Sequence, residues 1–160
     1  MIKGLHHNAY RCRDSEQTRK FYEDFLGLPL QLAFEIKQTI TGRESKVLHS
    51  FYEMDDGSFL AFFEEPDAPF EFKPQRDFDL HIALEVEHDQ LLEMMEKGKQ
   101  AGIETRGISD HDFIHSIYFR DPNGYVIELT AKTATHNAAT FNSATAHDIL
   151  GQWQNTKATG

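Results

Sequence analysis

Two histidines and one glutamate have the types and the spacing of metal ligands. His7 begins the triplet His-Asn-Ala, His81 begins the triplet His-Ile-Ala, and Glu128 lies in an apolar stretch just after Gly124. Alternation along a strand directs each histidine to the same face as the alanine two residues later. Two imidazoles and one carboxylate on one side of a metal leave neighbouring positions open, which suits non-haem Fe(II) chemistry. We therefore expect His7, His81 and Glu128 to converge on a metal ion.

Ala61 occupies the equivalent place in the first half of the chain. It follows Gly57 at the same spacing at which Glu128 follows Gly124. An alanine side chain has no donor atom, so it cannot ligate a metal. The sequence therefore predicts three protein ligands rather than four.

An internal repeat places these residues on matching elements. After each histidine triplet comes a helix-like stretch, which Asp14 or Asp89 can cap and which Gly27 or Gly102 ends. Stretches rich in aromatic and β-branched residues follow, and an Asp-rich turn precedes the last of them. The order is strand, helix and three strands, twice. We predict an α+β fold in which paired βαβββ modules form a cupped mixed sheet.

The same repeat predicts how the chain is organised. We expect one domain made of two modules, followed by a tail that is either loosely packed or contains a short helix near residues 148–154. The expected boundaries are module one at 1–65, a proline-containing linker at 66–78, module two at 79–131 and the tail at 132–160.

Composition and charge exclude several classes of function. Lys and Arg number 16 and Asp and Glu 26, so the net charge is −10 and no nucleic-acid partner is expected. Hydrophobic residues make up 39% of the chain, but the longest apolar run, Phe59 to Phe63, is too short to span a membrane. The first seven residues lack the apolar region of a signal peptide, and Cys12 has no second cysteine to pair with. We expect a cytoplasmic protein that acts on a small molecule.

The motifs of both repeats resemble those of one known superfamily. They are His7 with Asp14, Phe21-Tyr22 with Leu26-Gly27, His81, and Asp121-Pro122-Asn123-Gly124 with Glu128. Over roughly residues 1–131 they resemble the vicinal oxygen chelate superfamily, which includes glyoxalase I, extradiol dioxygenases, fosfomycin-resistance thiol transferases, methylmalonyl-CoA epimerase and bleomycin-binding proteins. The resemblance implies that His7, His81 and Glu128 are the metal ligands.

Within that superfamily the chain looks most like the type I extradiol dioxygenases. These enzymes carry a tyrosine ten residues before the ligand glutamate, as Tyr118 stands before Glu128. They also carry a histidine in the preceding loop, for which His111 is the candidate. The resemblance implies cleavage of a catechol-like ring with Fe(II) and dioxygen, with Mn(II), Zn(II) or Ni(II) as other possible metals. His111 would then transfer protons, and Tyr118 would hydrogen-bond the substrate oxygen.

Several alternatives stay open. The same ligand set serves thiol transferases of the fosfomycin-resistance type, whereas a glyoxalase- or epimerase-like isomerase would have a fourth ligand where Ala61 stands. A non-catalytic binding module would lack the metal set. Tyr118 and its apparent counterpart Tyr52 could also be core aromatics, and His111 an ordinary loop residue. A homodimer is expected, because exposed strand edges can pair.

Residues near His7 offer further alternatives. His6 competes with His7 as a ligand, although alternation points His6 to the other face. His49 is the nearest substitute for a further acid–base histidine. Arg11 shares the face of His7, where it could bind an anionic substrate group or form a surface ion pair.

Overall fold

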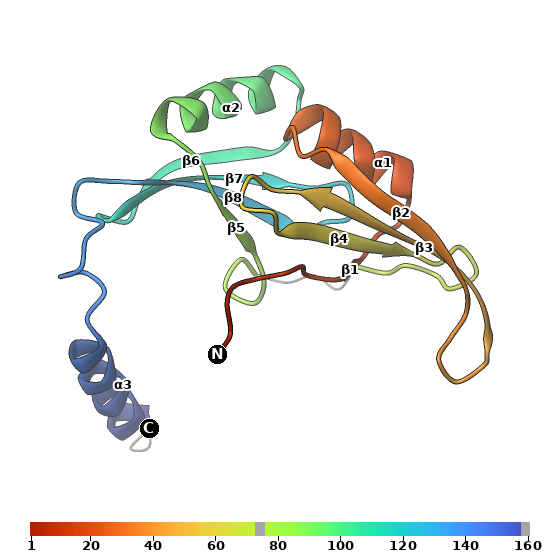
Figure 1. Cartoon of the computed structure of the whole chain (residues 1–160). Helices are drawn as coiled ribbons and strands as arrows, with labels where there is room; N and C mark the ends of the chain where they lie inside the picture. The colour runs from red at the N-terminus through yellow and green to blue at the C-terminus, as the bar shows by residue number, and fades with distance from the viewer. Residues whose placement is uncertain (73–75, 158–160) are drawn as a thin grey trace. The chain divides into compact units, whose positions relative to one another are not determined.

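The chain forms the predicted strand–helix–three-strand pattern twice (Figure 1). The computed structural model describes residues 1–72 and 76–157, so residues 73–75 of the expected linker and 158–160 of the tail lie outside the described residues. The α+β class expected from the sequence is confirmed. The first repeat comprises β1 (Tyr10–Arg11), α1 (Ser15–Arg19), η1 (Lys20–Phe25), β2 (Leu30–Gln38), β3 (Glu44–Glu53) and β4 (Phe59–Glu64). The second comprises β5 (Ile82–Glu85), α2 (His88–Gln100), β6 (Thr105–Asp110), β7 (Ile114–Arg120) and β8 (Val126–Lys132).

Each repeat builds a four-stranded sheet. The strand order is β1-β4-β3-β2 in the first sheet and β5-β8-β7-β6 in the second. In the first sheet β1 runs parallel to β4, with Tyr10 opposite Phe62, whereas β2, β3 and β4 pair antiparallel. β1 and β5 are therefore edge strands, and each follows closely after one of the two predicted histidine ligands.

Local signals in the sequence explain the first helix. The Asp14 carboxylate accepts a hydrogen bond from the N–H of Gln17 at 2.7 Å, as expected of an N-cap. The helix continues in η1 as a turn of π-helix, in which the N–H of Leu26 donates to the carbonyl of Phe21 at 2.9 Å. Gly27 ends the helix with a φ of 84°, a conformation that glycine adopts at little steric cost.

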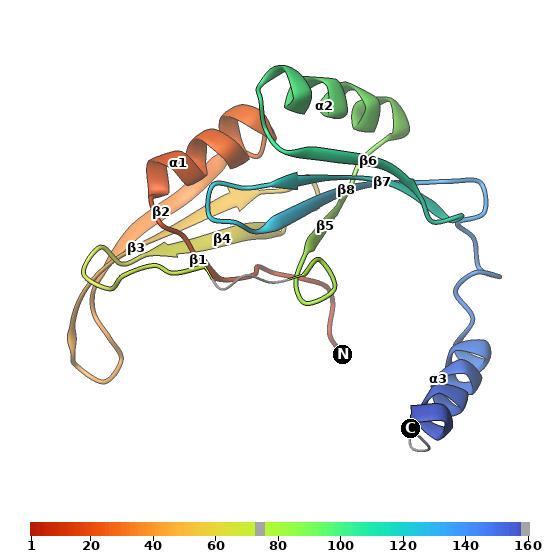
Figure 2. The ribbon, with the colours of Figure 1, turned by 180° about the vertical axis from the view of Figure 1, so that it is seen from behind.

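The core of the first sheet lies beneath α1 and η1, which cover one of its faces (Figure 2). The Tyr22 ring is fully buried, with its centre 4.6 Å from that of Phe62 and 5.7 Å from that of Tyr52. The Tyr22 hydroxyl donates to the buried carboxylate of Asp121 at 2.9 Å. This bond holds the Asp-Pro-Asn-Gly turn between β7 and β8 against the first helix.

The second helix, α2, starts differently from the first. Glu87 occupies its N-cap position and makes no side-chain capping bond, and the helix begins at His88. The expectation that Asp89 caps this helix is therefore wrong. Asp89 lies in the first turn instead, where its negative charge interacts favourably with the helix dipole.

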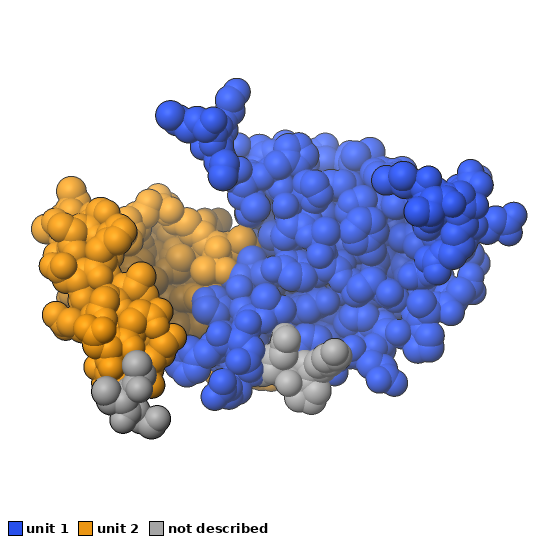
Figure 3. Space-filling model, turned by 90° about the horizontal axis from the view of Figure 1, so that it is seen from below, with its two compact units in different colours: residues 1–82, 120–127 blue, residues 83–119, 128–160 orange. Residues whose placement is uncertain are grey.

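The chain divides into two compact units (Figure 3). Unit 1 contains residues 1–82 and 120–127, and unit 2 contains residues 83–119 and 128–160. Unit 1 therefore holds the first repeat together with the turn between β7 and β8. The module boundaries expected from the sequence stay a prediction.

The tail after the second repeat carries helix α3 (Ser143–Lys157), which is longer than the stretch 148–154 considered from the sequence. None of its residues is buried, and the side chains of Ile149 and Trp153 are exposed. Among the residues that the structure describes, no helix is both long and apolar enough to cross a membrane.

Candidate functional site

Three of the predicted site residues meet in unit 2. Glu128 in β8 is buried, with 6% of its surface exposed. Tyr118 in β7 hydrogen-bonds to Glu128, and Nε2 of His111 lies 3.0 Å from the Tyr118 hydroxyl oxygen. Because a hydroxyl has one proton, a Tyr118 that donates to the carboxylate accepts from the N–H of His111. The structure thus joins a predicted ligand to both predicted catalytic residues.

The surroundings of Tyr118 keep its hydroxyl protonated. Burial, and after it the negative charge of Glu128, raises the pKa of Tyr118. The Arg106 guanidinium lies 5.5 Å from the centre of the Tyr118 ring, a cation–π contact. At neutral pH this phenol is therefore a hydrogen-bond donor rather than a phenolate.

The turns before β4 and β8 show how the two repeats align. The N–H of Met54 donates to the carbonyl of Ser58 at 2.8 Å, and the N–H of Asp121 donates to that of Tyr125 at 2.9 Å. Met54 and Asp121 are therefore equivalent positions. Phe51 stands three residues before Met54, and Tyr118 stands three residues before Asp121. The counterpart of Tyr118 is therefore Phe51, not Tyr52.

The sequence match between Tyr52 and Tyr118 is thus wrong by one residue. Tyr52 is buried against Tyr22 on the helix-covered face of its sheet, because side chains alternate between faces. Phe51 pairs with Ala61 across β3 and β4. Unit 1 therefore carries phenylalanine and alanine at the places where unit 2 carries Tyr118 and Glu128.

His7 lies in unit 1 beside this apolar pair. A single bridge pairs its backbone with Phe59, and its ring centre lies 5.4 Å from that of Phe51 and 6.3 Å from that of His49. Nδ1 of His7 lies 2.8 Å from Nδ1 of His6, so one ring donates to the other. The His7 side chain is exposed.

His81 precedes β5 and is also exposed. Its Nδ1 lies 2.7 Å from the carbonyl oxygen of Asp77. A carbonyl only accepts, so Nδ1 carries the proton and the lone pair is on Nε2. Metal-bound histidines show the same arrangement, in which a backbone carbonyl fixes the tautomer and the orientation of the ring.

His49 is buried in a cluster of aromatic rings in unit 1. Its ring stacks on Phe63 with centres 3.7 Å apart, and its Nδ1 donates to the carbonyl of Phe62 at 3.0 Å. Burial lowers the pKa of His49. The imidazole is therefore neutral at pH 7.

Within residues 1–72 and 76–157, no three His, Cys, Asp or Glu side chains form a group that could hold a metal ion. His7, His81 and Glu128 as one ligand set thus stay a prediction. Their chemistry fits a divalent metal, because His81 is fixed in a ligating tautomer and Glu128 is oriented by Tyr118.

Comparison with known proteins identifies the family. Residues 4–129 match the model of the Glyoxalase/Bleomycin resistance protein/Dioxygenase superfamily. The chain belongs to this superfamily. The resemblance inferred from the motifs is therefore confirmed, as is the α+β fold of two βαβββ modules, which the structure shows as two four-stranded sheets with helices. Members of the superfamily bind divalent metals and small molecules.

One named relative is the metallothiol transferase FosB of Shouchella clausii (strain KSM-K16). It is 27% identical over 161 residues, which cover 94% of each chain. Among solved structures, a superfamily domain from Frankia sp. EAN1pec aligns with a TM-score of 0.66 and 18% identity over 85% of this chain and 96% of that one. The fosfomycin resistance protein FosX of Listeria monocytogenes, complexed with Mn(II) and sulfate, aligns with a TM-score of 0.64 and 22% identity. The alignment covers 84% of this chain and 96% of the FosX chain.

The first of these relatives overturns the prediction of an extradiol dioxygenase. It matches this chain over nearly its whole length, and it is a metallothiol transferase, not an oxidoreductase. The finer expectations that depended on this prediction lose their support: Fe(II) as the first choice of metal, dioxygen as a substrate, and cleavage of a catechol-like ring as a step in the breakdown of aromatic compounds. The prediction failed because two imidazoles and one carboxylate serve both chemistries, and Tyr118 and His111 do not discriminate between them.

Proposed function

We propose that this chain is a metal-dependent transferase that adds a low-molecular-weight thiol to a small electrophile, with the epoxide fosfomycin as the first candidate. The observation that carries the proposal is the 27% identity to a metallothiol transferase over nearly the whole of both chains. The hydrogen-bonded row of Glu128, Tyr118 and His111 supports it, because opening an epoxide requires a group that protonates the released oxygen.

His7, His81 and Glu128 are the residues that we propose as the metal ligands. Mn(II) is the first candidate, because the FosX structure that aligns with this chain contains it. A divalent cation held there would supply Lewis-acid polarisation of an oxygen of the electrophile.

The chain's own residues take part in the reaction through the hydrogen-bonded row of Glu128, Tyr118 and His111. The thiolate sulfur forms a bond to an epoxide carbon, the bond from that carbon to oxygen breaks, and the electron pair stays on the oxygen. The Tyr118 hydroxyl, which donates to Glu128 in the structure, turns its proton to this oxygen and transfers it, so that the oxygen becomes a hydroxyl. Nε2 of His111 lies 3.0 Å from the hydroxyl oxygen of Tyr118, and His111 returns a proton from solvent to the phenol. The product is a thioether alcohol.

We further propose that two copies of the chain complete the site. His7 stands beside the edge strand β1 of one sheet, and His81 stands before the edge strand β5 of the other. Open strand edges pair readily. Pairing β1 of one copy with β5 of another would bring the two exposed histidines together.

Mass spectrometry of the reaction products tests the proposed function. The full-length protein with Mn(II), fosfomycin and glutathione should yield the thioether adduct. Glu128→Gln should abolish turnover, whereas Glu85→Gln, which removes an exposed carboxylate on β5, should not. Absence of the adduct with every thiol tried would overturn the proposal.

A further inference from the structure

Four rings gather on the face of the first sheet that points away from α1 and η1. Tyr52 of β3 faces the helices, so alternation directs His49 and Phe51 to the opposite face. Phe34 of β2 pairs with His49 and shares its face. His7 adds a fourth ring from the edge of the sheet, where its backbone bridges to β4. These four side chains form the ring cluster.

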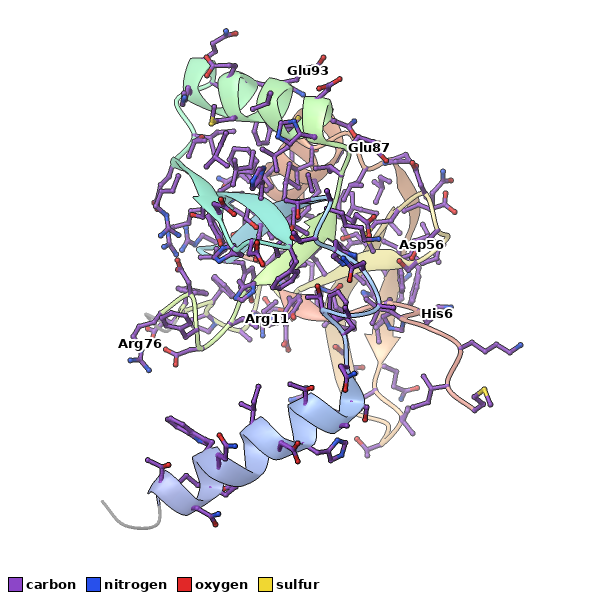
Figure 4. All side chains as sticks on the ribbon, turned by 90° about the vertical axis from the view of Figure 1, so that its left-hand side faces the viewer. His6, Arg11, Asp56, Arg76, Glu87 and Glu93 are labelled. Carbon is purple, nitrogen blue, oxygen red and sulfur yellow. The ribbon has the colours of Figure 1, made fainter. Side chains whose placement is uncertain are left out.

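Ala61 makes room for the ring cluster. It lies in β4 directly opposite Phe51 and is fully buried. Because its side chain is short, the His7 ring reaches across β4 to Phe51, with 5.4 Å between the ring centres. In Figure 4 the labelled His6 and Arg11 mark the stretch of chain that carries His7. The absence of a larger side chain at position 61 thus brings the proposed metal ligand into contact with the rings of β3.

The ring cluster offers apolar surface that a ligand can reach. The centre of the Phe34 ring lies 5.4 Å from that of His49 and 6.1 Å from that of Phe51. Phe34 is 41% exposed, and Leu32, which pairs with Phe51 on the same face, is 50% exposed. Exposed apolar surface beside a reactive centre is typical of sites that bind the apolar part of a small molecule.

His49 brings an unused hydrogen-bond acceptor to the ring cluster. Its Nδ1 donates to the carbonyl of Phe62, so the lone pair is on Nε2. In the part of the chain that the structure describes, no donor hydrogen-bonds to Nε2. Only 6% of His49 is exposed, but Nε2 keeps contact with solvent. Packing therefore holds this acceptor in place, and a ligand on the ring cluster can donate to it.

Arg11 adds no free cation to the ring cluster, although it lies on the same face. Its Nη2 donates to the carbonyl of Ala68 at 3.0 Å, and its Nη1 lies 3.4 Å from the carboxylate of Glu65. The guanidinium is thus engaged within the protein. The exposed part of the cluster, which belongs to Phe34, favours an uncharged group over an anionic one.

We propose that the ring cluster binds the side group of the electrophile, and that it prefers an aryl group with a hydrogen-bond donor for Nε2 of His49. The inference rests on the proposed thiol transfer, which places the epoxide beside His7. The His7 ring centre lies 5.4 Å from that of Phe51 and 6.3 Å from that of His49. An aryl group one or two bonds from the epoxide spans this distance. Fosfomycin has only a methyl group to place there, so aryl epoxides should be better substrates.

Steady-state kinetics with the full-length protein, Mn(II) and glutathione test the preference for an aryl group. After correction for the uncatalysed rates, kcat/KM should be about tenfold higher for styrene oxide than for 1,2-epoxypropane. Phe34→Ala should reduce this ratio about fivefold, and its partial exposure on an edge strand lets the variant fold. Glu35→Gln, an exposed neighbour on the other face of β2, is the control and should keep the ratio. A ratio near one in the wild type, or an unchanged ratio in Phe34→Ala, would overturn the inference.

Calorimetric titration with benzyl alcohol and benzyl methyl ether, which do not react, tests the role of His49. The wild type should bind the alcohol about tenfold more tightly, because only the alcohol donates to Nε2. His49→Gln keeps an acceptor oxygen and should keep the preference, whereas His49→Leu should lose it. Equal binding of the two probes by the wild type would overturn the role of His49.

The same titration separates this inference from the proposed function. A preference for the alcohol that depends on His49, in a protein that transfers a thiol to no epoxide, would support the ring cluster as a ligand site and overturn the function. Thiol transfer at equal corrected rates to the two epoxides, with equal binding of the two probes, would overturn the ring cluster and leave the function standing.

Discussion

The hydroxyl of Tyr118 and the imidazole of His111 form a hydrogen-bonded pair, with 3.0 Å between the oxygen and Nε2. The same hydroxyl contacts Glu128, whose charge adds to burial in raising the pKa of Tyr118. One phenol thus lies between a carboxylate of the proposed metal set and a histidine that solvent can reach. This row gives unit 2 a proton path that unit 1, with Phe51 and Ala61 in the matching places, does not have.

Tyr118→Phe removes the hydroxyl from this row. We expect activity or metal affinity to fall about 10–100-fold, the usual cost of removing a group that orients a metal ligand. Tyr52→Phe is the matched control, because that hydroxyl belongs to the helix-covered core of unit 1. Measurement of kcat/KM together with Mn(II) titration checks both variants, and equal losses in the two would contradict the assigned role.

Mixing two inactive variants tests whether the site is shared between copies. His7→Ala and Glu128→Gln should each be inactive alone. Unfolded together and refolded, they should recover about one quarter of wild-type activity, because half of the randomly formed dimers then contain one complete site of two. A mixture that stays inactive, although size-exclusion chromatography shows dimers, would contradict a shared site.

His49 predicts how stability depends on pH. Burial holds the pKa of His49 below its usual value in the folded state. The unfolded chain therefore takes up a proton below about pH 6.5 that the folded chain resists. The contribution of His49 to the free energy of unfolding is complete above that pH. It is lost as the pH falls toward the lower pKa that His49 has in the folded state.

The measurement is the midpoint of thermal unfolding between pH 7.5 and 5.0, for the wild type and for His49→Gln. Glutamine can donate to the Phe62 carbonyl as His49 does, but it does not titrate. The wild type should lose more stability across this range than the variant. Parallel curves would show that His49 is not the titrating group.

Gly98 is the one glycine within α2, and we predict that it cannot be replaced without loss of stability. A Cβ there would lie 2.5 Å from the ring of Phe119 and 2.5 Å from the hydroxyl of Thr105. Gly98→Ala should destabilise unit 2 by about 1–3 kcal/mol, because overpacking outweighs the gain in helix propensity. Gly151→Ala in α3, where a Cβ meets nothing within 4 Å, is the control and should cost no stability in denaturant unfolding.

Much of the fold was predictable because it depends on features that recur in the sequence. The triplets at His7 and His81 and the glycines at positions 27 and 102 mark the two repeats, and Asp14 caps its helix as expected. The face of Tyr52 was not predictable in this way. When the pairing of a strand shifts by one residue, every side chain of that strand moves to the opposite face of the sheet. Similar residues in two repeats do not reveal such a shift.

The chemistry of the site was predictable only in part. Glu128, Tyr118 and His111, which the family resemblance put forward as site residues, lie within hydrogen-bonding distance of one another in sequence order along the row, and their roles stay a prediction. The reaction did not follow from them, since the same donors suit dioxygen activation and thiol transfer.

The most direct test of the account is whether product formation from fosfomycin requires the thiol. Phosphorus NMR follows the phosphonate of fosfomycin incubated with the full-length protein and Mn(II), with and without glutathione. The account predicts a new phosphonate signal, that of the thioether adduct, only when the thiol is present. Conversion to the same extent without thiol, or no conversion with any thiol, would contradict it.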